Sequence, residues 1–128
     1  MLSHRLISAA RSATPVLLFL TLGVLLGPHS AAAHAILIAS QPQEGGHVPA
    51  GKVAIHLQYN SRIDRARSRL TLTRPDRSKA TLPIASAGGP DEMDTAATLT
   101  PGAYALRWQV LAIDGHITRG DVNFNVGP

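Results

Sequence analysis

Tyr104-Ala105-Leu106-Arg107-Trp108-Gln109-Val110 is the stretch that decides the fold of this chain. Its large apolar residues alternate with small or polar ones, and a period of two places every second side chain on one face of a β-strand. The same alternation recurs in residues 53–59 and 122–126. We therefore predict three strands, each with one face directed at a core and one directed at solvent.

Shorter apolar runs and frequent turn residues fill much of the remaining chain. Runs at residues 35–39, 70–73 and 81–84 fit further strands, and turns rich in Gly and Pro separate them. No stretch shows a convincing 3.6-residue apolar period. About seven short strands are typical of an all-β, immunoglobulin-like β-sandwich. We expect Trp108 in the core between the sheets, and residues 85–94 in a flexible loop.

Residues 1–33 have the three parts of a cleaved secretory signal peptide. Arg5 and Arg11 supply the positive charge, residues 16–26 form an apolar run, and small residues lead to a cleavage site after Ala33. The apolar run is short for a membrane span, which needs about 20 residues. The alternative is an uncleaved anchor. We predict that the protein is exported to the periplasm or an equivalent compartment.

Cleavage after Ala33 would leave one small domain, residues 34–128, with no transmembrane segment. Two of the 12 Lys and Arg lie in the signal, so this domain has a net charge of only +2. The chain has no cysteine, which excludes a disulfide and a thiolate metal site. Nucleic acid is not an expected partner, because the domain is exported, has few aromatic residues and shows no known reading module.

His34, Asp114 and His116 form a candidate metal-binding set. As the first residue of the exported chain, His34 would offer its α-amino nitrogen and its imidazole to one ion. Asp114 and His116 are two residues apart, so in an extended segment they project to the same side. Nitrogen-rich sets with an oxygen favour Cu(II), and a lone Met93 cannot build a thioether cluster for Cu(I). Taken singly, His34 also fits an ordinary loop histidine, and Asp114-Gly115-His116 a polar β-turn.

Several short segments occur in a characteristic order and spacing. They are His34-Ala35-Ile36-Leu37, Ser40-Gln41-Pro42, Glu44-Gly45, residues 53–59, residues 99–104, Arg107-Trp108-Gln109-Val110, Asp114-Gly115-His116 and residues 120–124. Through these segments, residues 34–128 resemble the CopC-type periplasmic copper-binding proteins. The resemblance implies a Greek-key β-sandwich that binds one Cu(II) ion per chain through a histidine brace. His34 would supply its amine and ring, His116 a second ring, and Asp114 an oxygen. It also implies copper resistance, or delivery of copper to an inner-membrane transporter.

Two features depart from that family. Where its members often carry Phe-Ser-Glu, with an acid close to the copper site, this chain has Tyr59-Asn60-Ser61. Acids near a metal orient its ligands and tune its affinity, so affinity or exchange rate is expected to differ. The methionine-rich Cu(I) site of some members is not matched either.

The other histidines and a basic run have simpler interpretations. We read His47 as an exposed loop histidine, with accessory ligation as the alternative, and His56 as solvated; His4 and His29 lie in the signal. A basic run suggests docking to an acidic partner or an anionic membrane surface, or a solvated edge strand whose charges discourage pairing. The run consists of Arg62, Arg65, Arg67 and Arg69.

Three classes of function remain in competition. The favoured one is a monomeric, non-enzymatic copper carrier or sequestering protein. A metal-free β-sandwich module for adhesion or assembly is the second. A copper-dependent oxidative enzyme is the third, and it is disfavoured because the sequence shows no array of exposed aromatic residues for a polysaccharide and no soft ligand.

Overall fold

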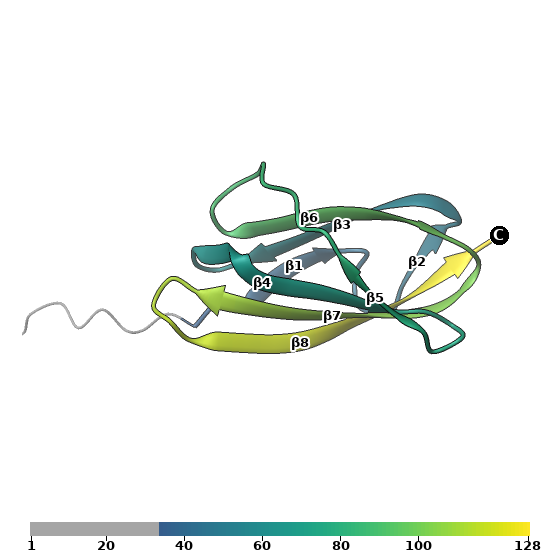
Figure 1. The fold of residues 1–128 in the computed structure, drawn as a ribbon. Helices are drawn as coiled ribbons and strands as arrows, with labels where there is room; N and C mark the ends of the chain where they lie inside the picture. Colours follow the sequence, from purple (N-terminus) through teal and green to yellow (C-terminus); the bar gives the residue numbers. More distant parts are fainter. Residues whose placement is uncertain (1–33) are drawn as a thin grey trace, which may run out of the picture.

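The structure of the protein, a computed structural model, describes residues 34–128 (Figure 1). The predicted signal peptide lies outside the described residues. The regular structure of the described part is entirely β-strand, so no helix in it is suited to crossing a bilayer. The eight strands are β1 Leu37–Gln41, β2 Gly46–Pro49, β3 Gly51–Tyr59, β4 Ile63–Thr73, β5 Lys79–Leu82, β6 Glu92–Leu99, β7 Gly102–Ala112 and β8 Ile117–Gly127.

The strands form two sheets that pack face to face, as Figure 1 shows. One sheet has the order β1-β3-β6 and the other has the order β2-β8-β7-β4-β5. Neighbouring strands pair antiparallel, except for β2 and β8, which run parallel. The chain passes from one sheet to the other at most connections, and only β4–β5 and β7–β8 are consecutive neighbours within a sheet. The predicted all-β, immunoglobulin-like sandwich is confirmed.

Two of the eight strands do not follow from the sequence patterns. β6 begins at Glu92, so the prediction of a flexible loop over residues 85–94 is wrong at its C-terminal end. Of the residues of β6 only Met93 and Leu99 are buried, which leaves an alternation too weak to detect. β2 contains His47, so the prediction of a loop there is also wrong, although the side chain is exposed as expected. Four residues paired along a sheet edge give almost no sequence signal.

The core lies between the two sheets and follows the predicted alternation. Ile55 and Leu57 of β3 face Leu106 and Trp108 of β7 across it, and all four are at most 8% exposed. Burial of side chains of this size stabilises a fold by about 1.5–3 kcal/mol each. Trp108 also meets the ring of Tyr59 edge-on, with ring centroids 5.5 Å apart, so its predicted core position is confirmed.

Gly120 of β8 makes room for the indole of Trp108. The two residues are register partners, and a Cβ atom on Gly120 would lie 2.4 Å from Cζ2 of the indole. A glycine at this place in a strand therefore marks a close approach between the sheet backbone and a large side chain.

The basic run lies where β4 has one free side. β5 pairs only with residues 70–73 of β4, so the earlier part of the strand has β7 on one side and no strand on the other. Arg62, Arg67 and Arg69 are exposed there, as the edge-strand interpretation predicts. Arg65 differs, because its guanidinium donates hydrogen bonds to backbone carbonyls of the segment before β6.

The sequence predicts a solvated His56, but in the structure this side chain is paired with another. It lies on β3 directly opposite Asp94 of β6, and its Nδ1 is 2.5 Å from Asp94 Oδ1. Both side chains are a little over one-third exposed. The hydrogen bond to Asp94 raises the pKa of His56 above its ordinary value. The pair therefore links two strands of the smaller sheet most strongly when the imidazole is protonated.

The His56–Asp94 pair should make stability depend on pH. Because the folded-state pKa of His56 is raised, its contribution is complete below the unfolded-state pKa, near 6.5, and is lost as pH rises through the folded-state pKa. His56→Gln should therefore cost more free energy of unfolding at pH 5.5 than at pH 8.5, by up to about 1 kcal/mol for a partly exposed pair. Urea unfolding at the two pH values measures this. Asp94→Asn should remove the same pH dependence, and equal losses for His56→Gln at both pH values would contradict the assignment.

Candidate metal centre

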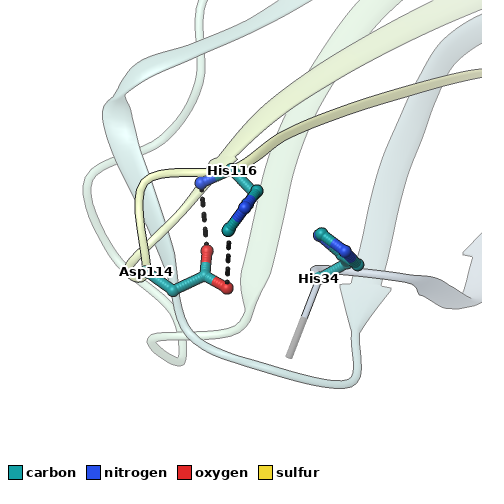
Figure 2. Close-up of side chains that lie close together, drawn as sticks. All are labelled: His34, Asp114 and His116. Carbon is teal, nitrogen blue, oxygen red and sulfur yellow. Dashed lines mark hydrogen bonds and ion pairs between the residues drawn. The ribbon is translucent and has the colours of Figure 1, made fainter. Parts of the chain in front are cut away.

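The three predicted ligands lie together at one end of the sandwich (Figure 2). Donor atoms of His34, Asp114 and His116 are all within 4.8 Å of one another, and all three residues are exposed. The two imidazole rings have centroids 4.6 Å apart and stand nearly perpendicular, at 87°. His34 precedes β1, whereas Asp114 and His116 lie in the turn between β7 and β8. The fold therefore brings together side chains from opposite ends of the described chain.

The β7–β8 turn fixes the backbone that carries Asp114 and His116. The amide of Ala112 donates to the carbonyl of His116 at 2.8 Å, and the amide of Gly115 donates back to the carbonyl of Ala112 at 2.9 Å. Gly115 has φ +91°, a left-handed conformation that side chains rarely tolerate. The Asp-Gly-His order thus combines a residue that allows the tight turn with two polar residues that flank it.

Asp114 holds the ring of His116. Its Oδ1 accepts a hydrogen bond from the backbone amide of His116 at 3.0 Å, and its Oδ2 lies 3.1 Å from Nδ1 of the same residue (Figure 2). The backbone hydrogen bond from His116, more than the ring, lowers the pKa of Asp114. An ionised carboxylate that accepts a hydrogen bond from Nδ1–H leaves Nε2 of the imidazole free to bind a metal. Asp114 can therefore orient a ligand as well as offer its own oxygen.

Two polar side chains fasten the segment that follows His34. Thr118 Oγ1 donates to the carbonyl of Ala35 at 2.6 Å, and Ala35 is completely buried. The amide of Ile36 donates to Asn60 Oδ1 at 2.8 Å, while the amide of Asn60 donates to the carbonyl of Ile36 at 3.0 Å. These bonds tie the chain just after His34 to both sheets, so its backbone is held beside the β7–β8 turn.

Two contributors to the site, Thr118 and Asn60, do not follow from the sequence patterns. Thr118 lies two residues after His116, and Asn60 directly follows β3. Neither position belongs to a sequence motif for metal ligands. Ser61, which offers no carboxylate, has a buried hydroxyl without a hydrogen-bond partner among the described residues. The candidate ligands in this chain are therefore two histidines and one aspartate.

Exposed apolar residues lie close in sequence to these ligands. Ile36, Ile113 and Ile117 are 57%, 69% and 48% exposed, although residues of this type are usually buried. Ile36 lies two residues after His34, and the other two flank the Asp114-Gly115-His116 turn. Of the four large apolar side chains that the described residues leave exposed, all but Ile38 are thus within two residues of a candidate ligand.

This chain is similar to known proteins of one domain family. The CopC domain family model matches residues 37–127. Protein YobA of Escherichia coli K12 is 33% identical over 123 residues, which cover 93% of this chain and 98% of that protein.

Two solved structures share the fold over most of the described chain. CopC from Methylosinus trichosporium OB3b superposes with a TM-score of 0.66 at 25% identity and covers 74% of this chain and 95% of that one. PcoC, a methionine-rich copper resistance protein from Escherichia coli, superposes with a TM-score of 0.62 at 26% identity and covers 74% of this chain and all of PcoC. From the matched domain and its relatives, we conclude that this chain belongs to the CopC domain family.

Proposed function

We propose that the exported form of this protein binds one Cu(II) ion at His34, Asp114 and His116. The observation that carries the proposal is the convergence of these three side chains within 4.8 Å in a CopC-family sandwich. His34 contributes its α-amino nitrogen and its ring, His116 contributes its ring, and Asp114 contributes an oxygen near the ion. Copper is the cargo of this site, and the protein carries out no reaction on it.

The donor chemistry favours the oxidised ion. A site with three nitrogens and an oxygen in a tetragonal arrangement suits Cu(II), which also heads the affinity series of divalent metals. A Cu(I) site would need soft sulfur ligands. The described chain offers only Met93, and this side chain is completely buried in the core beside its register partner Leu57. The protein thus differs in its available ligands from PcoC, a methionine-rich copper resistance protein.

The exposed ligands suit a protein that gives its ion to a partner. All three are open to solvent, so an acceptor can approach the ion without unfolding the sandwich. Such an acceptor would cover Ile36, Ile113 and Ile117, and the burial of apolar surface would favour the encounter. Delivery to an inner-membrane copper transporter and sequestration for copper resistance both use this site. A metal-free adhesion module or an oxidative enzyme has no comparable observation in its favour.

The amine ligand depends on cleavage after Ala33, and one added residue should expose its role. A mature protein extended by an alanine before His34 keeps both imidazoles but moves the α-amino group off the chelating residue. We expect its Cu(II) affinity to fall by at least about 100-fold, because the nitrogen that replaces the amine is a peptide nitrogen. Competition with a chromophoric Cu(II) chelator measures the affinity. A matched control carries the extra alanine after Pro128, and equal affinity of the two extended proteins would remove the amine from the ligand set.

Copper binding should also weaken in acid. An α-amino group and an imidazole have ordinary pKa values near 7.7–8.0 and 6.5, and each must lose its proton to bind a metal. Asp114 has a lowered pKa and stays ionised over this range. We expect the apparent Cu(II) affinity to fall by at least about 100-fold between pH 7 and pH 5, because more than one nitrogen is protonated over that interval. Chelator competition at each pH, corrected for the chelator's own protonation, provides the measurement; a flat profile would refute a nitrogen-rich site.

Thr118 should act as a positioning residue for His34. Thr118→Val keeps the shape of the side chain but removes the hydrogen bond to the carbonyl of Ala35. Loss of a group that orients a ligand typically costs 10–100-fold in metal affinity, and we expect a loss of about tenfold here. Thr118→Ser should restore most of it. Thr95→Val is the matched control, because the buried Thr95 hydroxyl has no hydrogen-bond partner among the described residues. A loss of stability in Thr118→Val with unchanged copper affinity would show that the bond is only structural.

A further inference from the structure

A second group of metal-ligating side chains lies on the outer face of the smaller sheet. His56 of β3 and Glu92 and Asp94 of β6 place one nitrogen and two oxygens within 4.8 Å of one another. His56 is the register partner of Asp94, and Glu92 lies two residues along the same strand. Their neighbours in sequence, Leu57 and Met93, are buried in the core, so the three polar side chains share the opposite face. None of the three belongs to the metal centre described above.

The spacing of these atoms is close to what one ion requires. Ligand atoms about 2.0–2.1 Å from a tetrahedral ion lie roughly 3.3 Å apart. His56 Nδ1 and Asp94 Oδ1 are 2.5 Å apart, and a carboxylate oxygen of Glu92 lies within 4.8 Å of a donor atom of each. Small rotations of partly exposed side chains are therefore enough to surround an ion. One imidazole with two carboxylates, and water in the fourth position, is a donor set that Zn(II) accepts.

The segment before β6 holds the carboxylate of Glu92 in place. Arg65 donates from Nη1 to the carbonyl of Gly89 at 2.5 Å and from Nη2 to the carbonyl of Ser86 at 3.0 Å. The amide of Gly89 in turn donates to Glu92 Oε2 at 2.8 Å. Arg65 of β4 thus anchors the segment, and the backbone amide of Gly89 fixes the carboxylate of Glu92. Such support from outside the ligand set is typical of sites that hold a metal.

A glycine leaves space above the same carboxylates. Gly88 has φ +106°, and a Cβ atom there would lie 2.9 Å from Asp94 Oδ2 and 3.4 Å from Glu92 Oε2. Any other residue at position 88 would press against these oxygens. The nearby cation, Arg65, directs its N–H groups at backbone carbonyls. Once His56 has lost its proton, as a metal ligand must, the two carboxylates outweigh the single charge of Arg65 and the group attracts a cation.

We propose that His56, Glu92 and Asp94 form a second metal site, which binds one divalent transition-metal ion of the Zn(II) type, independently of the site at His34 and His116. The ion replaces the proton that His56 and Asp94 otherwise share, and it neutralises the repulsion between the two carboxylates. The protein then has one site that depends on its free N-terminus and another that is built wholly within a sheet.

Zinc titration of a protein whose first site is disabled tests this proposal. The background is the mature chain with an alanine added before His34 and with His116→Ala, which removes two nitrogen ligands of the first site and leaves the β3–β6 face intact. Calorimetry with ZnCl₂ should show one equivalent bound. His56→Gln or Glu92→Gln in this background should weaken binding by more than the 10–100-fold typical of groups that only orient a ligand. His47→Gln, which changes an exposed histidine on β2, is the matched control and should bind as the background does.

The outcomes separate the second site from the first. Absence of zinc binding to the background, or binding that survives both His56→Gln and Glu92→Gln, would overturn the proposal while leaving the copper assignment untouched. Circular dichroism checks that each variant is folded. Glu92→Gln is informative even if His56→Gln unfolds, because Glu92 makes no hydrogen bond to His56 among the described contacts.

Discussion

The antiparallel pairing of β7 with β8 is the interaction on which both the sandwich and the candidate metal centre depend. The paired residues run without interruption from Gly102 to Leu111 of β7. Because Trp108 and Phe124 are buried on the core side of these strands, a slip of one residue would turn them to solvent, and the register is therefore strongly specified. The two paired strands are joined by a tight turn. The turn holds His116 at a fixed place at the end of a rigid sheet, close to the N-terminal segment of the described chain.

The two groups of potential ligands differ in how they are built. His34 and His116 are far apart in sequence, and their meeting rests on the hydrogen bond between Thr118 and Ala35 and on the contacts of Asn60 with Ile36. The group on β3 and β6 does not depend on such additional contacts, because residues on paired strands of a sheet already lie side by side. The first group therefore combines a fixed backbone with exposed side chains, and the second is held by the same pairing that holds the smaller sheet together.

How far the sequence predicts the structure depends on how strongly each strand alternates. β3, β7 and β8 alternate over seven or more residues or carry large aromatic residues, so they are predicted correctly. β6 presents small and polar residues on its outer face, and its first residues look like the continuation of a loop rich in glycine. The same weakness conceals the pairing of His56 with Asp94, because the partner strand must be known before a cross-strand pair can be recognised.

The sequence by itself determined the all-β class and the core position of Trp108, and it singled out the three residues proposed here as copper ligands, because apolar periodicity and ligand chemistry are local properties of the chain. Tertiary structure alone decided which polar side chains support these ligands, and it alone brought His56, Glu92 and Asp94 onto one face. The physical reason is that such contacts join strands distant in sequence, and their geometry follows from sheet order and register, which no single strand encodes.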